Sequence, residues 1–188
     1  NVPIEPLHTA VSVPAAASVI VDGLFGIGLA RPLTGLHAAL VDTINASGLP
    51  VFALDIPSGL NGDTGQPPAP DSPVIQARAT ITFLAVKPGV LTGDGRDATG
   101  DIALADLQAA QAAYDGVIEA DAFVNTPSRW LAHVPRRRHN GHKGTYGSAA
   151  IVGGAAGMVG APLLSARGAL YLGAGKVHVV SLAADAPR

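Results

Sequence analysis

Apolar runs alternate with amphipathic stretches along the chain, and this rhythm is typical of a parallel α/β protein. Residues 17–24 (ASVIVDGL) predict a buried strand, because an almost unbroken apolar run ends there on an acid. Residues 33–48 predict a helix, since apolar residues recur at helical spacing before a glycine stop. Residues 50–59 predict a second strand that runs into a Pro-Ser-Gly turn.

The middle of the chain continues the pattern with one long interruption. Residues 62–75 contain too many prolines and turn-forming residues for regular structure, so they predict a loop. Residues 79–89 and 100–107 predict two further strands, because β-branched and apolar residues are bounded there by Gly and Pro. One parallel sheet is therefore expected from the first half of the chain.

The pattern changes after this half and then starts again. Residues 114–141 are irregular and hold most of the basic run PRRRHNGHKG, which is typical of a connection between domains. Residues 147–158 predict a strand that leads into a glycine loop, residues 160–175 an alanine-rich helix, and residues 176–182 one more strand. The sequence thus predicts the beginning of a second βα unit.

Composition narrows the class of partner. The chain has 188 residues, of which 48% are hydrophobic and 14% charged, with a formal net charge of -2. This balance indicates a globular protein without a general attraction to nucleic acid or anionic lipid, so we expect no nucleic acid and no membrane among its partners. The absence of cysteine excludes disulfides and thiolate zinc sites and suits the cytoplasm, where we expect the protein to act. No apolar run approaches the ~20 residues of a membrane-spanning helix.

Two acids follow neighbouring predicted strands, and they are the first candidates for chemistry. Asp22 precedes the glycine-rich stretch GLFGIGLAR, and Asp55 precedes IPSG. In open α/β sheets, ligands bind outside the carboxyl ends of the strands, where backbone N–H groups of glycine loops and a cation such as Arg31 can contact a phosphate. The stretch lacks the third glycine of the usual dinucleotide fingerprint, and Asp residues commonly cap turns. From the residues alone, a ligand site and a purely structural turn both remain open.

Longer motifs carry a more specific resemblance. The stretches VDGLFGIGLARPLTG, ALDIPSGLNGDTG, ATITFLAVKPGVLTGDGR and GDIALADL resemble the second half of the NAD(P)H-hydrate epimerase domain, the YjeF N-terminal family. The stretch HKGTYGSAAIVGGAAGMVGAPLLSARGALYLGAGKVHVV resembles the opening of the ADP-dependent NAD(P)H-hydrate dehydratase domain, which has a ribokinase-like fold. Their order is similar to that of the bifunctional NAD(P)H-hydrate repair enzymes.

The resemblance implies a fold and a domain organisation. It implies part of a Rossmann-like, parallel-sheet, three-layer α/β domain over residues 1–113, an interdomain linker over 114–141, and the start of a ribokinase-like α/β domain over 142–188. The chain would then span the junction of two domains.

The resemblance also implies roles for individual residues. Asp22 and Ser58 match ligands of a potassium ion, and Asp55 matches a substrate-binding position that we interpret as the catalytic acid/base group. The other positions that match contacts to the hydrated dinucleotide are Gly26, Ile27, Gly28, Leu29, Ala30, Arg31 and Pro32, with Ala161 in the dehydratase part.

The function that the resemblance implies is the repair of hydrated NAD(P)H. The epimerase would interconvert the R and S forms of this small-molecule substrate with potassium, and the dehydratase would convert the S form to NAD(P)H with ADP and magnesium. We expect a homo-oligomer. Two other classes stay open: a ribokinase-like small-molecule kinase, and a non-catalytic Rossmann-like binding protein.

Overall fold

The computed structural model describes residues 12–109, 122–134 and 136–184. The chain divides into two compact units, Asn1–Phe123 and Val124–Arg188. Each unit is described by itself.

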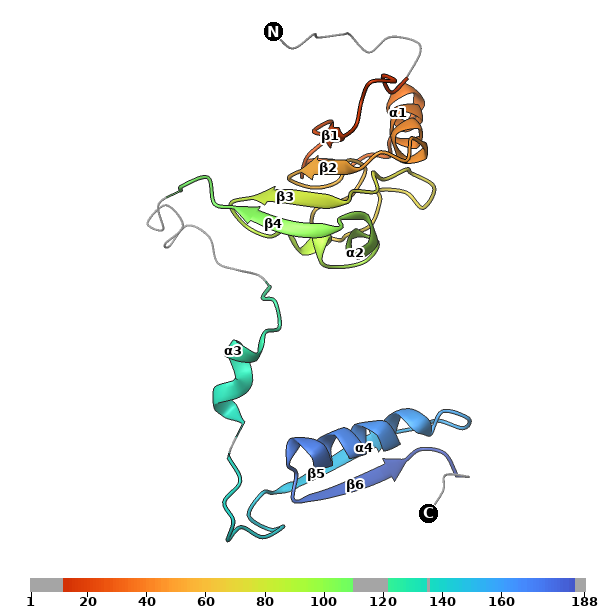
Figure 1. Cartoon of the computed structure of the whole chain (residues 1–188). Helices are drawn as coiled ribbons and strands as arrows, with labels where there is room; N and C mark the ends of the chain where they lie inside the picture. Colours follow the sequence, from red (N-terminus) through yellow and green to blue (C-terminus); the bar gives the residue numbers. More distant parts are fainter. Residues whose placement is uncertain (1–11, 110–121, 135, 185–188) are drawn as a thin grey trace. The chain divides into compact units, whose positions relative to one another are not determined.

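The first unit is built on a four-stranded parallel sheet (Figure 1). Its strands are β1 (Ile20–Asp22), β2 (Val51–Leu54), β3 (Ala79–Phe83) and β4 (Asp101–Ala105), hydrogen-bonded in the order β1-β2-β3-β4. Each lies inside a predicted strand, so the expectation of a parallel α/β fold is confirmed.

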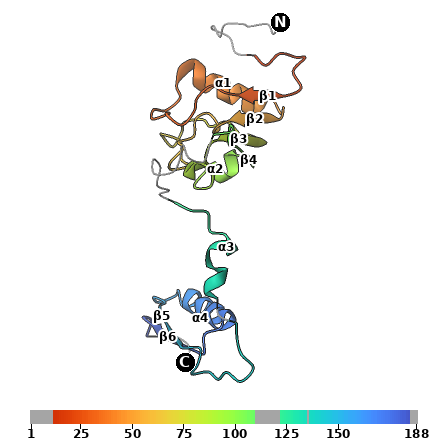
Figure 2. The same cartoon turned by 90° about the vertical axis from the view of Figure 1, so that its left-hand side faces the viewer.

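The core of this unit lies between the sheet and α1 (Gly35–Ala46), which lies next to β1 and β2 in both views (Figures 1 and 2). Successive side chains of a strand point to opposite faces, so alternate residues of β2 reach the same core. Val51 and Ala53 of β2 pack with Val41 and Ile44 of α1. The remaining buried members of the cluster are Leu33, Ile75 and Ala77.

The prediction of a strand over residues 79–89 was wrong in its second half. β3 ends at Phe83, because Leu84 adopts a left-handed backbone with φ of 64°, which a strand cannot contain. The chain then turns into η1 (Pro88–Val90), where a proline without an N–H cannot continue a sheet ladder. A further short helix, α2 (Gly95–Ala98), precedes β4 and was not predicted.

The second unit contains a parallel pair of strands covered by a helix. β5 (Ser148–Gly153) pairs with β6 (Lys176–Ser181) along its whole length, and α4 (Gly160–Leu172) connects them. Gly173 ends the helix in a left-handed conformation with φ of 113°, the usual use of a glycine at this position. These three elements agree with the prediction from the sequence.

The range 114–141, predicted as irregular, holds two short helical segments. They are α3 (Pro127–Trp130) and η3 (Leu131–His133). Pro127 stands at the first helical position, where its missing N–H costs nothing. Residues 114–121 and residue 135 of that range lie outside the described residues.

Candidate functional site

The carboxyl ends of β1 and β2 bring the two candidate acids to one edge of the first sheet. Asp22 is the last residue of β1 and is in register with Ala53 of β2. Asp55 directly follows β2, and its N–H donates to the carbonyl of Ile81 in β3. This is the edge at which parallel α/β proteins bind ligands.

Asp22 and Ser58 form a buried polar pair at this edge. Both are 1% exposed. The Ser58 hydroxyl donates to Asp22 Oδ1 at 2.6 Å, and the Ser58 N–H donates to Asp22 Oδ2 at 2.8 Å. The N–H of Phe25 donates to the Ser58 hydroxyl at 2.9 Å, which ties the glycine-rich loop after β1 to the turn after β2. The pair therefore fixes the relative positions of the two loops.

Asp55 is held in an unusual backbone conformation and by several donors. Its φ is 71°, in the left-handed region that few non-glycine residues adopt. Its Oδ1 forms an ion pair with Lys87 Nζ at 2.5 Å and accepts the N–H of Phe83 at 3.2 Å. The Asp55 side chain keeps 20% of its area exposed, so the carboxylate is fixed and still reachable by a ligand.

A cavity of about 540 Å³ lies next to Asp55. Its walls are the loop after β1 and the Asp55 side chain itself. The structure thus brings together seven of the predicted binding residues around one space: Gly26, Ile27, Gly28, Leu29, Ala30, Arg31 and Asp55. Pro32 is not among the residues that line it, and Ala161 belongs to the second unit.

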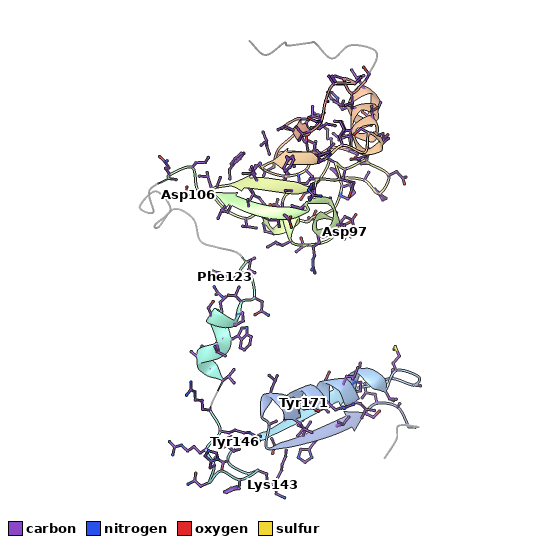
Figure 3. All side chains as sticks on the ribbon, in the orientation of Figure 1. Asp97, Asp106, Phe123, Lys143, Tyr146 and Tyr171 are labelled. Carbon is purple, nitrogen blue, oxygen red and sulfur yellow. The ribbon has the colours of Figure 1, made fainter. Side chains whose placement is uncertain are left out.

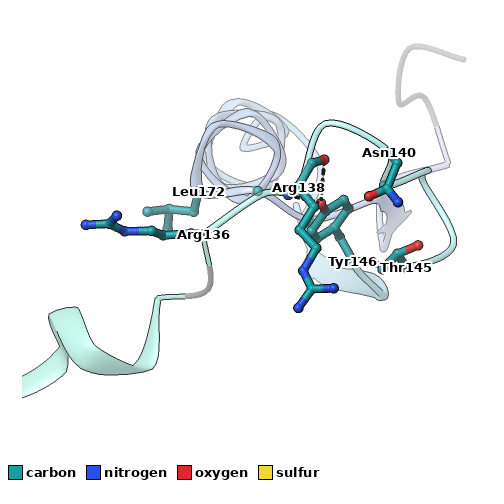
Figure 4. Close-up of a pocket in the computed structure, with 9 residues that line it drawn as sticks. Arg136, Arg138, Asn140, Thr145, Tyr146 and Leu172 are labelled. Carbon is teal, nitrogen blue, oxygen red and sulfur yellow. Dashed lines mark hydrogen bonds between the residues drawn. The ribbon is translucent and has the colours of Figure 1, made fainter.

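A second cavity, of about 680 Å³, lies in the second unit (Figure 4). Its polar side chains include Arg136, Arg138, Asn140, Thr145 and Tyr146. The Arg136 and Arg138 side chains extend in different directions (Figure 4), so they do not gather their charges on one point. No Asp or Glu occurs between residues 122 and 184, so this cavity has no carboxylate for acid/base chemistry.

Comparison with known proteins agrees with the geometry of the first unit. Residues 2–89 match the family described as YjeF-related protein N-terminus. That part of the chain is similar to the YjeF-related N-terminal family. Its loop after β1, Asp55 and the Asp22–Ser58 pair all lie within the matched residues.

Curated relatives of this chain are named bifunctional NAD(P)H-hydrate repair enzyme Nnr. The relative from Escherichia coli is 38% identical over 169 residues, which cover 89% of this chain and 32% of the relative. The relative from Vibrio cholerae is 41% identical over 170 residues, covering 87% and 32%. The one from Thermofilum pendens is 35% identical over 169 residues, covering 90% and 31%. The chain spans about a third of the length of these relatives.

Two further observations concern the described residues of the chain. No group of three or more His, Cys, Asp or Glu side chains in them could hold a metal ion. No helix within the described ranges is long and apolar enough to cross a membrane.

Lys87 is the site residue that the sequence pattern did not reveal. Its Nζ donates hydrogen bonds to Asp55 Oδ1, the Phe83 carbonyl and the Thr82 hydroxyl. The sequence predicts that AVKPG ends a strand, and this prediction does not tell where the Lys87 side chain points. The one sign in the sequence is that a charged residue stands between an apolar run and a proline.

Proposed function

We propose that the first unit binds hydrated NAD(P)H and interconverts its R and S forms, with Asp55 as the group that moves the proton. The observation that carries the proposal is the Asp55 carboxylate, fixed on the wall of a cavity whose other walls are a glycine-rich loop. The names of the curated relatives support the choice of substrate.

The geometry suits a base at the hydroxyl-bearing carbon of the hydrated ring. The ion-paired Asp55 carboxylate accepts the proton of the C6 hydroxyl, and the oxygen forms a carbonyl as the bond between C6 and the ring nitrogen breaks. The electron pair of that bond goes to the nitrogen and delocalises toward the carboxamide. Closure on the other face of the carbonyl reforms the bond, and Asp55 returns the proton to the oxygen.

The glycine-rich loop would bind the rest of the dinucleotide. Gly26 and Gly28 expose backbone N–H groups without a Cβ, which lets a pyrophosphate approach closely. Arg31 adds a guanidinium that can pair with a phosphate. Binding energy from these remote groups would position the ring against Asp55.

Potassium is part of the proposal. Asp22 and Ser58 offer only oxygen atoms, which is the donor chemistry that a hard cation takes, and together they would provide a small part of its ligand shell. A bound cation would supply positive charge near the substrate's anionic groups.

For the second unit, we propose the start of a ribokinase-like dehydratase domain from residue 142, after a linker over 114–141. The match to the bifunctional relatives supports this, because it covers 87 to 90% of the chain and so extends beyond residue 89. Ala161 as a substrate contact, ADP and magnesium as requirements of the dehydratase, assembly as a homo-oligomer and a cytoplasmic location belong to the same proposal.

The test of the epimerase is Asp55→Asn in the full-length protein, assayed with a single purified epimer of hydrated NADH and chromatographic separation of the R and S forms. We expect the rate of interconversion to fall by about 100-fold or more, because the amide cannot accept the proton. Asp97→Asn, at an exposed acid on α2, is the matched control. A fully active Asp55→Asn, or a wild-type protein that does not interconvert the forms, would contradict the proposal.

A further inference from the structure

The two oxygens of the Asp55 carboxylate have different surroundings. Oδ1 accepts from Lys87 Nζ at 2.5 Å, from the Phe83 N–H at 3.2 Å and from the Thr82 hydroxyl at 3.4 Å. None of the residues that the structure describes donates a hydrogen bond to Oδ2. This oxygen faces the glycine-rich loop, where a Cβ built on Gly26 would lie 4.0 Å from it. One oxygen is anchored, and the other is directed toward the cavity.

Lys87 uses its full donor capacity in this anchoring. An ammonium group has three N–H donors, and Nζ has three acceptors here: Asp55 Oδ1, the Phe83 carbonyl at 2.6 Å and the Thr82 hydroxyl at 3.2 Å. Only 18% of the Lys87 side chain is exposed. Lys87 is not among the residues that line the cavity, so it acts on a ligand through Asp55.

The backbone is bent to make this arrangement possible. Leu84 and Asp55 both have left-handed φ angles, 64° and 71°. Such a conformation is unfavourable at a non-glycine residue and persists where the surrounding structure holds it. The N–H of Ala85 donates to the Phe83 carbonyl at 2.7 Å, so the chain after β3 folds back and returns Lys87 to the strand end.

We infer that Lys87 is a positioning residue that assigns separate tasks to the two Asp55 oxygens: Oδ1 is held by the protein, and Oδ2 is the atom that exchanges the proton with the substrate. The inference rests on the proposed epimerase activity. It predicts that loss of the ammonium lets the carboxylate rotate away from the reacting hydroxyl, while the binding of the dinucleotide by the loop is unaffected.

The experiment compares kcat and KM of the full-length protein for interconversion of the hydrate epimers. Lys87→Met keeps an aliphatic stem of similar length and removes the charge. We expect its kcat to fall by about 100-fold, the size of effect that misplacement of a catalytic group produces, with KM within about twofold of the wild-type value. Lys87→Arg, which restores a donor and a charge, should recover at least a tenth of the wild-type kcat. Arg96→Met, on α2, is the matched control for loss of an exposed cation.

A double-mutant cycle separates positioning from a general structural effect. In the Asp55→Asn background, Lys87→Met should change kcat by less than twofold, because residues that act as a unit are not additive. A loss that is the same in both backgrounds would overturn the inference, and so would an unchanged kcat or a rise in KM alone. If Lys87→Met does not fold, the test uses Thr82→Val, which removes the hydroxyl that contacts both Lys87 Nζ and Asp55 Oδ1. This variant should have a severalfold lower kcat at constant KM. An unchanged kcat would overturn the inference. A wild-type protein that does not interconvert the R and S epimers would instead contradict the proposed function itself.

Discussion

The two units place their cavities at opposite ends of their strands. In the first unit, the cavity lies beyond the carboxyl ends of β1 and β2, where Asp55 and the loop after Asp22 meet. In the second unit, it lies between residues 136–146, which precede β5, and residues 172–174, which precede β6. Carboxyl ends are the usual place for ligands in parallel α/β folds, so position alone favours the first cavity as the catalytic one, although the second is larger.

The units also differ in charge, and the difference shows that total charge does not locate a site. Residues 1–121 contain thirteen acids and four basic residues, whereas residues 122–188 contain one acid and eight basic residues. Much of the acidity is at the surface, as at Asp97 and Asp106 (Figure 3). The candidate site depends on two carboxylates with fixed partners, Asp22 with Ser58 and Asp55 with Lys87. What distinguishes it is that the partners hold these carboxylates in place.

The substitution Ser58→Ala should have the largest effect on stability, and it tests how firmly the candidate site of the first unit is held together. Ser58→Ala removes the short hydrogen bond to Asp22 and leaves the Phe25 N–H without its acceptor. We expect the first unit to lose about 2–3 kcal/mol, since hydrogen bonds to charged groups are worth about 1.5–3 kcal/mol each. Amide hydrogen exchange in β2 and β3 measures this loss separately from the second unit.

The control for this change is Ser128→Ala in the second unit, where the hydroxyl is exposed and forms a hydrogen bond with the Thr126 hydroxyl. It should alter the stability of either unit by less than about 0.5 kcal/mol. Equal effects of the two substitutions would mean that the Asp22–Ser58 pair does not hold the first site together.

Most of the fold could be predicted from the sequence, because buried parallel strands are short apolar runs with clear ends. The run before Asp22 and the run before Asp55 marked β1 and β2, and the alanine-rich stretch over residues 160–175 marked α4, which ends slightly earlier than predicted, at Leu172. The loop after β1 was recognisable from its glycines, and the structure places Asp55 beside it. The roles of these residues remain predictions.

The position of Lys87 could not be predicted, because it depends on the backbone of another residue. The apolar pattern extended the strand through Leu84, and nothing in the side chain of leucine indicates a left-handed φ. Only the folded turn returns Lys87 to Asp55, 32 residues away in sequence. Contacts of this kind are set by tertiary structure, and local patterns do not contain them.

A moderate effect is expected where the glycine-rich loop faces Asp55 Oδ2, the oxygen proposed to exchange the proton. Gly26→Val places a branched side chain next to Asp55 Oδ2, because a Cβ there lies 4.0 Å from this atom and has no other near neighbour. We expect kcat/KM for the hydrate to fall about tenfold, comparable to a misfit of one or two methyl groups in a pocket. Gly168→Val, in α4 of the second unit with nothing within 4 Å of its Cβ, is the control for adding the same side chain. An unchanged kcat/KM in Gly26→Val would place the substrate away from this loop.

The smallest expected effect concerns Arg137 and Arg138 of the second unit, two adjacent arginines whose guanidinium groups have different surroundings. The Arg137 guanidinium lies 4.7 Å from the centroid of the Tyr146 ring and donates to the Gly173 carbonyl at 2.8 Å, at the end of α4. Arg138 lines the cavity, and its guanidinium has no partner among the described residues.

Arg137→Ala should therefore lower the free energy of unfolding of the second unit by about 1 kcal/mol, and Arg138→Ala should lower it by less than about 0.5 kcal/mol. Hydrogen exchange in α4 and β6 measures both changes. Neither substitution should change epimer interconversion by more than about twofold, because the carboxylate proposed to be catalytic, that of Asp55, belongs to the first unit. A large loss of that activity in Arg138→Ala alone would show that the second cavity takes part in the reaction, and the contrast between the two units would fail.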